Sequence, residues 1–251
     1  MIPVGDEGHP RGGIPLINLA VIAINLAVFF LLQLPDEAFT MAYSAIPHEI
    51  TTGEDLIGPV PIQLPDGSVE TLPHADGPSP IQLTLLTSIF MHGGFAHILG
   101  NMLFLYIFGD NVERAFGPLV YTAFYLVTGL IASLAHVMFN AGSIIPSLGA
   151  SGAISGVLAG YLVLFPSNKV KVLVFMRFIP FVMTVPALVM IGLWALFQFI
   201  NGFGEIAATE QTSGVAYMAH IGGFVAGILL AFLLKPFAHR SPAELARRTV
   251  Y

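Results

Sequence analysis

Residues 118–139 of the chain are PLVYTAFYLVTGLIASLAHVMF, a run of 22 amino acids without Asp, Glu, Lys or Arg. A helix of this length rises about 33 Å, enough to cross a bilayer hydrocarbon core about 30 Å thick. The uncharged sequence continues up to Lys169, and the turn-forming residues 140–146 divide it. The stretch therefore predicts two consecutive membrane helices, over residues 118–139 and 150–165.

Other long apolar segments lie on both sides of this pair. They cover residues 15–34 and 95–108 before it, and lie within residues 178–201 and 214–234 after it. The sequence thus predicts an all-α integral membrane protein with six transmembrane helices in a compact bundle. The expected organisation is a cytoplasmic N-terminal segment (1–14), a six-helix membrane domain (15–234) and a basic cytoplasmic tail (235–251).

Composition agrees with a membrane protein and excludes several other classes. The chain is 55% apolar and only 10% charged, whereas soluble domains carry about 25% charged residues. The net charge is −6, and there is no basic stripe of the kind that binds nucleic acid. Cysteine is absent, which excludes disulfides, thiolate zinc sites and a cysteine nucleophile. Neither a metal nor another cofactor is expected.

The Lys and Arg residues predict the orientation, because cytoplasmic loops are enriched in them. When six helices are threaded, every basic residue falls on one side of the membrane. These residues are Arg11, Arg114, Lys169, Lys171, Arg177, Lys235, Arg240, Arg247 and Arg248. Both termini are therefore expected in the cytoplasm, and the long, acidic, Pro-rich loop 35–80 outside. We expect a multi-pass protein of a prokaryotic plasma or inner membrane, in contact with the lipid bilayer, and the sequence leaves its oligomeric state open.

Four polar residues lie inside predicted membrane helices, where such groups are costly and need a partner. They are His97, Asn101, Ser151 and His220. The three helices that carry them run from outside to inside, so all four residues are expected at one depth near the outer face. Helix 150–165 rises only about 24 Å, so its start is expected below the membrane surface.

Small residues predict that the fourth and sixth helices pack closely. The glycines recur at spacings of four residues, at Gly152, Gly156 and Gly160 on one helix and at Gly223 and Gly227 on the other. Such packing would bring the Ser151 hydroxyl to the His220 imidazole, as a nucleophile and its general base require. No carboxylate is placed to orient the histidine, so the sequence predicts a Ser-His dyad.

Each of these features has a simpler explanation when taken singly. Glycines at this spacing usually serve packing, a serine at a helix start is usually an N-cap, and a membrane histidine usually forms an interhelical hydrogen bond. His92 is interpreted in this way, as a structural residue that fixes the loop before the second helix. The joint occurrence of four polar residues at one depth favours catalysis.

Three motifs resemble those of rhomboid intramembrane serine proteases. They are residues 92–101 (HGGFAHILGN), 149–152 (GASG) and 219–223 (AHIGG). The resemblance implies Ser151 as nucleophile, His220 as general base, and an oxyanion hole of His97, Asn101 and the Ser151 backbone amide. It also implies that Glu113 and Arg114 hold the loop after the second helix.

Three features depart from the family pattern. The loop between the first two helices is long, and it has no Trp-Arg pair, since the only Trp is Trp194. Ser155 stands where some relatives have an aromatic residue that supports the histidine ring. The fifth helix, with Trp194, Phe197 and Phe199, is the candidate for a lateral gate through which substrates enter.

The expected function is endoproteolysis of single-span membrane proteins, in or next to their transmembrane segments. Two alternatives remain, a non-catalytic rhomboid-like protein that binds transmembrane segments and a small transporter that uses His97 and His220 as a proton relay. A zinc protease would need His-Glu-x-x-His on a helix, and an aspartic one would need two facing aspartates in the membrane. Neither pattern is present.

Overall fold

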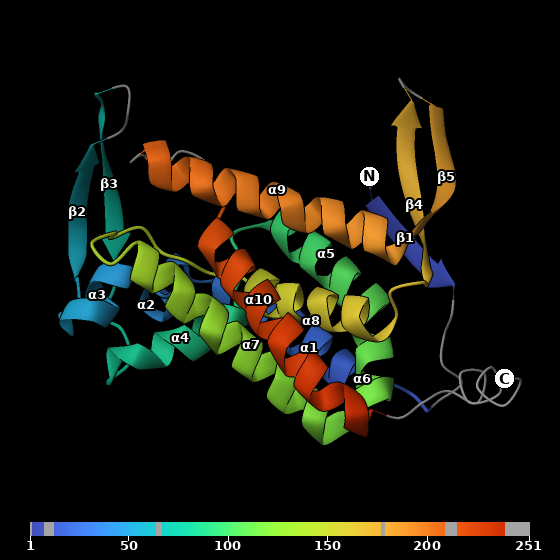
Figure 1. Ribbon diagram of the computed structural model, residues 1–251. Helices are drawn as coiled ribbons and strands as arrows, with labels where there is room; N and C mark the ends of the chain where they lie inside the picture. Colours follow the sequence, from blue (N-terminus) through green and yellow to red (C-terminus); the bar gives the residue numbers. More distant parts are fainter. Residues whose placement is uncertain (1, 8–12, 64–66, 177–178, 209–214, 239–251) are drawn as a thin grey trace, which may run out of the picture.

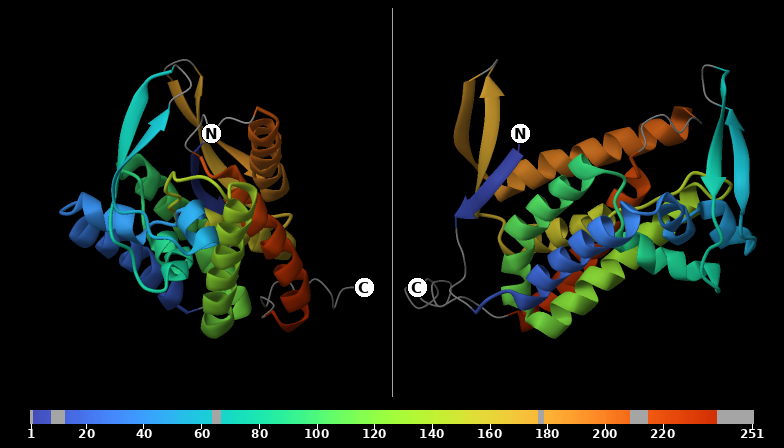
Figure 2. Two further views of the ribbon diagram at one scale, coloured as in Figure 1. Left: turned by 90° about the vertical axis from the view of Figure 1, so that its left-hand side faces the viewer. Right: turned by 180° about the vertical axis from the view of Figure 1, so that it is seen from behind.

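The computed structural model describes residues 2–7, 13–63, 67–176, 179–208 and 215–238. Within these ranges the protein is mainly helical, with a helix bundle and two small β-structures at opposite ends of it (Figure 1). The right-hand view in Figure 2, from behind, shows the same separation. The prediction of an all-α protein is therefore wrong in part, because five strands are present.

Four helical segments are long and apolar enough to cross a membrane. They are α1 with the π-helical turn that continues it (Leu16–Gln33), α7 (Pro118–Phe139), the first part of α9 (Ala187–Ala208), and α10 (Tyr217–Leu234) with the short turn after it. A fifth candidate is a pair of helical segments, Ile81–Phe90 and Phe95–Phe116, with a bend of 74° between them. Length and composition thus support four or five spans.

The bend in the fifth candidate lies at the break before α5 (Phe95–Phe104). The first segment is a succession of short turns, η2 (Ile81–Leu83), α4 (Thr84–Thr87) and η3 (Ser88–Phe90). Gly94 then has a φ of +152°, a backbone conformation that favours glycine. After α5, the helix continues through a π-helical turn and α6 (Asp110–Phe116), eight residues beyond the expected end at residue 108.

Helix α8 (Ser151–Leu164) lies in the middle of the bundle, packed against α7 and α10 (Figure 1). Eleven of its 14 residues are buried, so it is the core of the membrane domain. Its length corresponds to a rise of about 21 Å, shorter than the hydrocarbon core of a bilayer. It begins one residue later and ends one residue earlier than predicted.

Two regions that were expected to be helical or irregular form β-strands instead, near the ends of the bundle. An antiparallel sheet has the order β1 (Ile2–Glu7), β4 (Lys169–Met176), β5 (Ile179–Pro186). Lysines alternate with fully buried Val170 and Val172 in β4, a period of two that is typical of a strand. The fifth helix was predicted to lie within residues 178–201, but it begins only after Pro186 and continues to Ala208.

The long loop 35–80 is folded rather than irregular. It contains α2 (Glu37–Tyr43), α3 (Pro47–Thr52) and the hairpin of β2 (Gly58–Gln63) with β3 (Val69–His74). Its backbone pairs with the loop before α8, because Ala45 and Ser147 exchange N–H to carbonyl hydrogen bonds of 3.0 and 2.8 Å. The His48 N–H also donates to the Ser143 carbonyl at 2.9 Å. We call residues 36–76 the outer cap.

Part of the predicted organisation lies outside the described residues. This applies to Arg11, Arg177 and residues 239–251, which hold most of the predicted basic tail. Lys235, at the end of α10, donates to the Val163 carbonyl near the end of α8 at 2.9 Å. A cation there is favoured by the partial negative charge at a helix C-terminus.

A buried carboxyl group lies inside the outer cap. Glu49 is 2% exposed; its Oε1 accepts a hydrogen bond from the Leu56 N–H and lies 3.8 Å from His74 Nδ1. Burial raises the pKa of Glu49 to about 7, with a further rise from Asp55 and an opposing effect of the Leu56 N–H. Burial lowers the pKa of His74, which Asp55 opposes.

We predict that the variant Glu49→Gln stabilises the outer cap at neutral and alkaline pH. Because the pKa of Glu49 is raised in the folded state, stability is lost as the pH rises from about 4.5 to about 7. Glutamine is neutral at every pH, so the free energy of local opening of α3, measured by hydrogen exchange, should exceed that of wild type above pH 7. The expected difference is on the order of 2 kcal/mol.

The matched control is Glu54→Gln, because Glu54 is an exposed neighbour. It should leave the opening free energy unchanged. Equal protection of α3 in wild type and Glu49→Gln above pH 7 would contradict the buried, proton-sensitive role of Glu49.

Candidate active site

Ser151 is the first residue of α8, and the chain turns sharply into it. Gly149 has a φ of +140° and its N–H donates to the Ser88 carbonyl at 2.9 Å. A Cβ atom on Gly149 would lie 2.9 Å from the His97 imidazole. Glycine is therefore required at this turn both for its backbone conformation and for the close approach of His97.

Ser151 and His220 are in direct contact although 69 residues separate them. His220 Nε2 lies 2.8 Å from Ser151 Oγ, a hydrogen-bond distance. His220 is the fourth residue of α10, so the serine and the histidine face each other from the first turns of two neighbouring helices. This is the geometry that a serine nucleophile and its general base need.

The contact follows from how closely α8 and α10 approach. A Cβ atom on Gly223 would overlap the Gly152 carbonyl, and one on Gly227 would lie 2.5 Å from the Gly156 carbonyl oxygen. The backbones of the two helices thus touch directly, as small residues allow in membrane helices. The added Cβ positions on the glycines of α8 point at α7 instead. A Cβ atom on Gly152 would lie 2.6 Å from Ala132, one on Gly156 2.5 Å from Thr128 and one on Gly160 3.1 Å from the Phe124 ring.

His97 and Asn101 lie one turn apart on α5. His97 Nδ1 accepts a 3.3 Å hydrogen bond from the Gly93 N–H, and its ring packs edge-on against that of His92. Asn101 is 7% exposed, and its Nδ2 is buried without a hydrogen-bond partner among the described residues. A buried donor without a partner costs about 1–3 kcal/mol, so the amide is available to a bound ligand.

The three residues predicted as structural make contacts of different kinds. His92 is held through its backbone, which exchanges two hydrogen bonds with the Gln33 side chain, while its ring packs on His97. Glu113 accepts from the N–H groups of Ile17 and Asn18, at 3.1 and 2.7 Å.

Arg114 donates to Asp110 and to the Gly13 carbonyl. The Glu113 side chain therefore binds the first residues of α1, and Arg114 binds the chain just before that helix. The physical reason is that the first N–H groups of a helix lack partners within it and attract a carboxylate.

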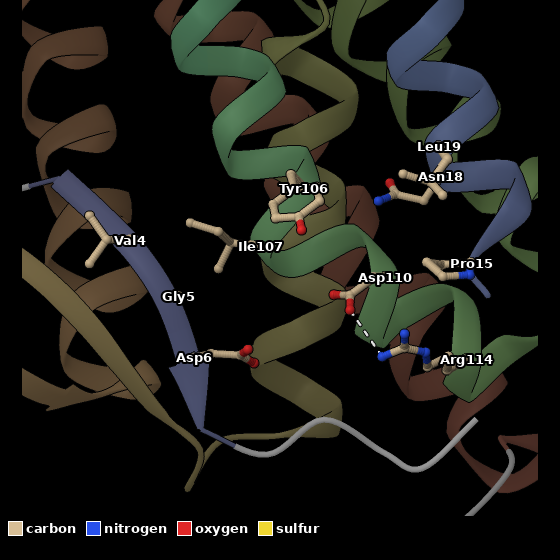
Figure 3. Close-up of a pocket in the computed structure, with 10 residues that line it drawn as sticks. All are labelled: Val4, Gly5, Asp6, Pro15, Asn18, Leu19, Tyr106, Ile107, Asp110 and Arg114. Carbon is tan, nitrogen blue, oxygen red and sulfur yellow. Dashed lines mark hydrogen bonds and ion pairs between the residues drawn. The ribbon is translucent and has the colours of Figure 1, made fainter. Parts of the chain in front are cut away.

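A cavity of about 370 Å³ lies beside these residues, and Asn18, Asp110 and Arg114 are part of its lining (Figure 3). Its polar lining includes Asp6, which accepts hydrogen bonds from the Tyr161 hydroxyl at 2.6 Å and from Asn111. Tyr161 is ten residues after Ser151, about 15 Å along α8. The polar groups of this cavity therefore tie β1 to α6 and to the far end of α8, and do not belong to the Ser151 site.

Sequence reasoning missed one side chain that contacts the site. Gln198 of α9 places its Oε1 2.7 Å from His220 Nδ1, on the opposite edge of the ring from Ser151. Trp194, one turn earlier on α9, lies with its ring centroid 6.0 Å from that of His220. The Ser155 hydroxyl donates to the Ser151 carbonyl, one turn earlier on α8, at 2.6 Å. The sequence feature that could have identified Gln198 is its strongly polar amide within an apolar helix.

Comparison with known proteins agrees with the motifs. The rhomboid domain family matches residues 82–237, more than half of the chain. The chain belongs to the rhomboid family. It is a multi-pass membrane protein, as its apolar helices also indicate.

Curated relatives come from a plant, a yeast and a bacterium. RHOMBOID-like protein 4 of Arabidopsis thaliana is 30% identical over 86% of this chain and 50% of its own length. Rhomboid protein 1, mitochondrial, of Saccharomyces cerevisiae is 26% identical over 90% of this chain and 54% of its own length. Rhomboid protease GluP of Bacillus subtilis is 35% identical over 60% of this chain and 25% of its own length. This rhomboid chain thus spans about half the length of the first two relatives.

We predict that Gly223→Ala destabilises the protein by pushing α8 and α10 apart. The added methyl group meets the Gly152 backbone, which cannot rotate away as a side chain can. Overpacking of this kind costs about 1–3 kcal/mol or more. The measurement is the thermal unfolding temperature in detergent micelles, which should fall by several degrees.

Gly192→Ala is the matched control, because it also adds a methyl group to a helix but meets open space. It should leave the unfolding temperature unchanged or slightly raised, since alanine favours helix. An unfolding temperature of Gly223→Ala equal to that of wild type would mean that α8 and α10 do not touch as described.

Proposed function

We propose that this protein is an intramembrane serine endopeptidase. It hydrolyses peptide bonds in or next to the transmembrane segments of single-span membrane proteins, through a dyad of Ser151 and His220. The observation that carries the proposal is the 2.8 Å hydrogen bond between Ser151 Oγ and His220 Nε2, in a chain of the rhomboid family. A bacterial relative is named a rhomboid protease, which supports the same activity.

The reaction is an acyl transfer in two stages. Ser151 Oγ attacks the scissile carbonyl carbon while its proton passes to His220 Nε2, and the carbonyl electron pair moves onto oxygen. The tetrahedral intermediate then collapses, the C–N bond breaks, and His220 returns the proton to the leaving amine. In the second stage water gives a proton to His220 Nε2 and attacks the acyl carbon. The bond between that carbon and Ser151 Oγ then breaks, and His220 returns the proton to Oγ, which releases the carboxylic acid and restores the Ser151 hydroxyl.

Negative charge on the carbonyl oxygen is stabilised by donors around Ser151. We assign this oxyanion hole to the Ser151 backbone N–H, His97 and Asn101. The unpartnered, buried Nδ2 of Asn101 and the position of Ser151 at the start of α8 support the assignment. Donors that await the developing charge in this way contribute a rate factor of about 10²–10³ each.

The depth of the site follows from the length of α8. We propose that α8 is a sixth span whose start is submerged below the outer surface, because a 14-residue helix is too short to reach both faces. A substrate must unwind locally to react there, since a helical backbone hides its carbonyl groups in hydrogen bonds. The outer cap then lies outside the membrane, and the sheet of β1, β4 and β5 lies in the cytoplasm of a prokaryotic cell.

We predict that Ser151→Ala abolishes hydrolysis of a transmembrane peptide and labelling by a fluorophosphonate probe. Loss of the nucleophile lowers kcat by about 10⁶-fold in serine proteases, which is below detection here. Gly192→Ala serves as the folded, active comparison. Cleavage that survives in Ser151→Ala excludes the dyad. A wild-type protein that binds transmembrane peptides without cleaving them would instead be the non-catalytic binder.

The orientation of the protein in the membrane can be tested by labelling single introduced cysteines. The chain contains no cysteine of its own that would react with the label. We predict that Thr71→Cys in β3 reacts with a membrane-impermeant maleimide in intact bacterial cells, whereas Thr184→Cys in β5 reacts only after permeabilisation. Thr71 and Thr184 are both exposed on the protein surface, so a difference in labelling reports the side of the membrane and not burial in the protein. The partition of Lys and Arg is the physical reason. The opposite labelling pattern would invert the proposed orientation.

A further inference from the structure

We infer that Gln198 of α9 is a positioning residue for the general base, an inference that rests on the proposed protease function. Its Oε1 accepts the Nδ1–H of His220, so that the Nε2 lone pair is directed at the Ser151 hydroxyl.

The two hydrogen bonds of His220 lie on opposite edges of its ring. Nδ1 is 2.7 Å from Gln198 Oε1, and Nε2 is 2.8 Å from Ser151 Oγ. A neutral imidazole carries one N–H and one lone pair, and the partner of one nitrogen decides the role of the other. With Oε1 as acceptor at Nδ1, the proton lies on that nitrogen and Nε2 is free to take the proton of Ser151.

Gln198 thus occupies the place that a carboxylate has in a catalytic triad. In triads the acid holds the imidazole in the productive tautomer and orientation. Among the described residues no Asp or Glu hydrogen-bonds His220. An amide provides the same acceptor without the charge, which suits a site surrounded by lipid, where a carboxylate would be costly.

The same face of α9 also packs on the imidazole ring. Trp194 and Gln198 are four residues apart, so both project from one side of the helix. The Trp194 ring centroid lies 6.0 Å from that of His220, and the Tyr217 ring lies edge-on at 6.4 Å. Helix α9 therefore contacts His220 through the tilted Trp194 ring as well as through a hydrogen bond, and the orientation of the imidazole depends on the position of α9.

Helix α9 buries a smaller share of its residues against the protein than the other three long apolar segments do. Of residues 187–204, 22% are buried, against 39% in the span that contains α10. In Figure 1 it lies along one side of the bundle, and in Figure 2 it keeps that place. Displacement of α9 would remove both supports of the base at once, so His220 is oriented for catalysis only while α9 is packed against α10.

A merely structural hydrogen bond between α9 and α10 would predict different effects of mutation. It would change stability and leave the pH dependence of kcat/KM as it is. Other titratable groups near His220 are Tyr217 on its own helix, His97 on α5 and His136 on α7. These are unchanged in Gln198 variants, so a shift of the pH profile reports on the Gln198 contact itself.

The experiment compares Gln198→Met, Gln198→Glu and the control Asn201→Leu with wild type, in hydrolysis of a fluorogenic transmembrane peptide in detergent micelles from pH 5 to 9. Methionine keeps the length of the side chain and removes the acceptor, so kcat should fall about 10- to 100-fold with KM nearly unchanged. Glutamate restores the acceptor with a charge. It should return kcat to near the wild-type plateau and move the acid limb to higher pH by about one unit.

Asn201 is the matched polar residue of α9, because it hydrogen-bonds the Phe197 carbonyl of its own helix. Its leucine variant should keep the wild-type kcat and pH profile. Wild-type kcat and pH profile in Gln198→Met, or an unshifted acid limb in Gln198→Glu, would overturn the inference. Should Gln198→Met fail to fold, the Glu variant decides alone.

Failure of the proposed function itself is a separate result. It would appear as hydrolysis that persists in Ser151→Ala under the same conditions, whatever the Gln198 variants do.

Discussion

Direct contact between the backbones of α8 and α10 is the constraint on which the rest of the molecule depends. In lipid no hydrophobic force separates buried from exposed apolar side chains, so helices associate through close packing and hydrogen bonds. Gly223 lies against the Gly152 carbonyl, and Gly227 against that of Gly156. This contact sets both the distance between the two helix axes and their register, and the register in turn brings Ser151 Oγ to His220 Nε2 at 2.8 Å.

The opposite side of α8 and its start are fixed by other elements. Gly152 and Gly156 also face α7, where Ala132 and Thr128 approach within 2.6 and 2.5 Å of an added Cβ atom. The outer cap pairs with the loop before α8 through Ala45 and Ser147. Ser151 is thus held by the packing of α8 against α7 and α10 and by the backbone hydrogen bonds of the loop that precedes it, in a helix that is itself the core of the bundle.

The parts of the fold and of the site that could be predicted are those marked by a local sequence pattern, whereas contacts between distant residues could not be predicted. The helix over residues 118–139 was predicted with both ends correct, because charge and turn residues bound it. The strand that begins at Lys169 was missed, since alternation of lysine with apolar residues also fits a segment at the membrane interface. The fold of loop 35–80 depends on pairing across a hundred residues, as between Ala45 and Ser147, for which no periodic pattern exists. Gln198 is not ionisable and lies outside the family motifs, so neither of these signals identifies it.

The site combines two kinds of support that respond differently to motion. The contact between Ser151 and His220 comes from helices that cannot separate without breaking a glycine-lined interface. The orientation of the imidazole comes instead from α9, through one hydrogen bond of Gln198 and the ring of Trp194. A hydrogen bond contributes only about 0.5–1.5 kcal/mol net, far less than a packed helix interface. A displacement of α9 would therefore leave Ser151 and His220 together and would change only the orientation of the His220 ring. Return of α9 would restore that orientation without rebuilding the core.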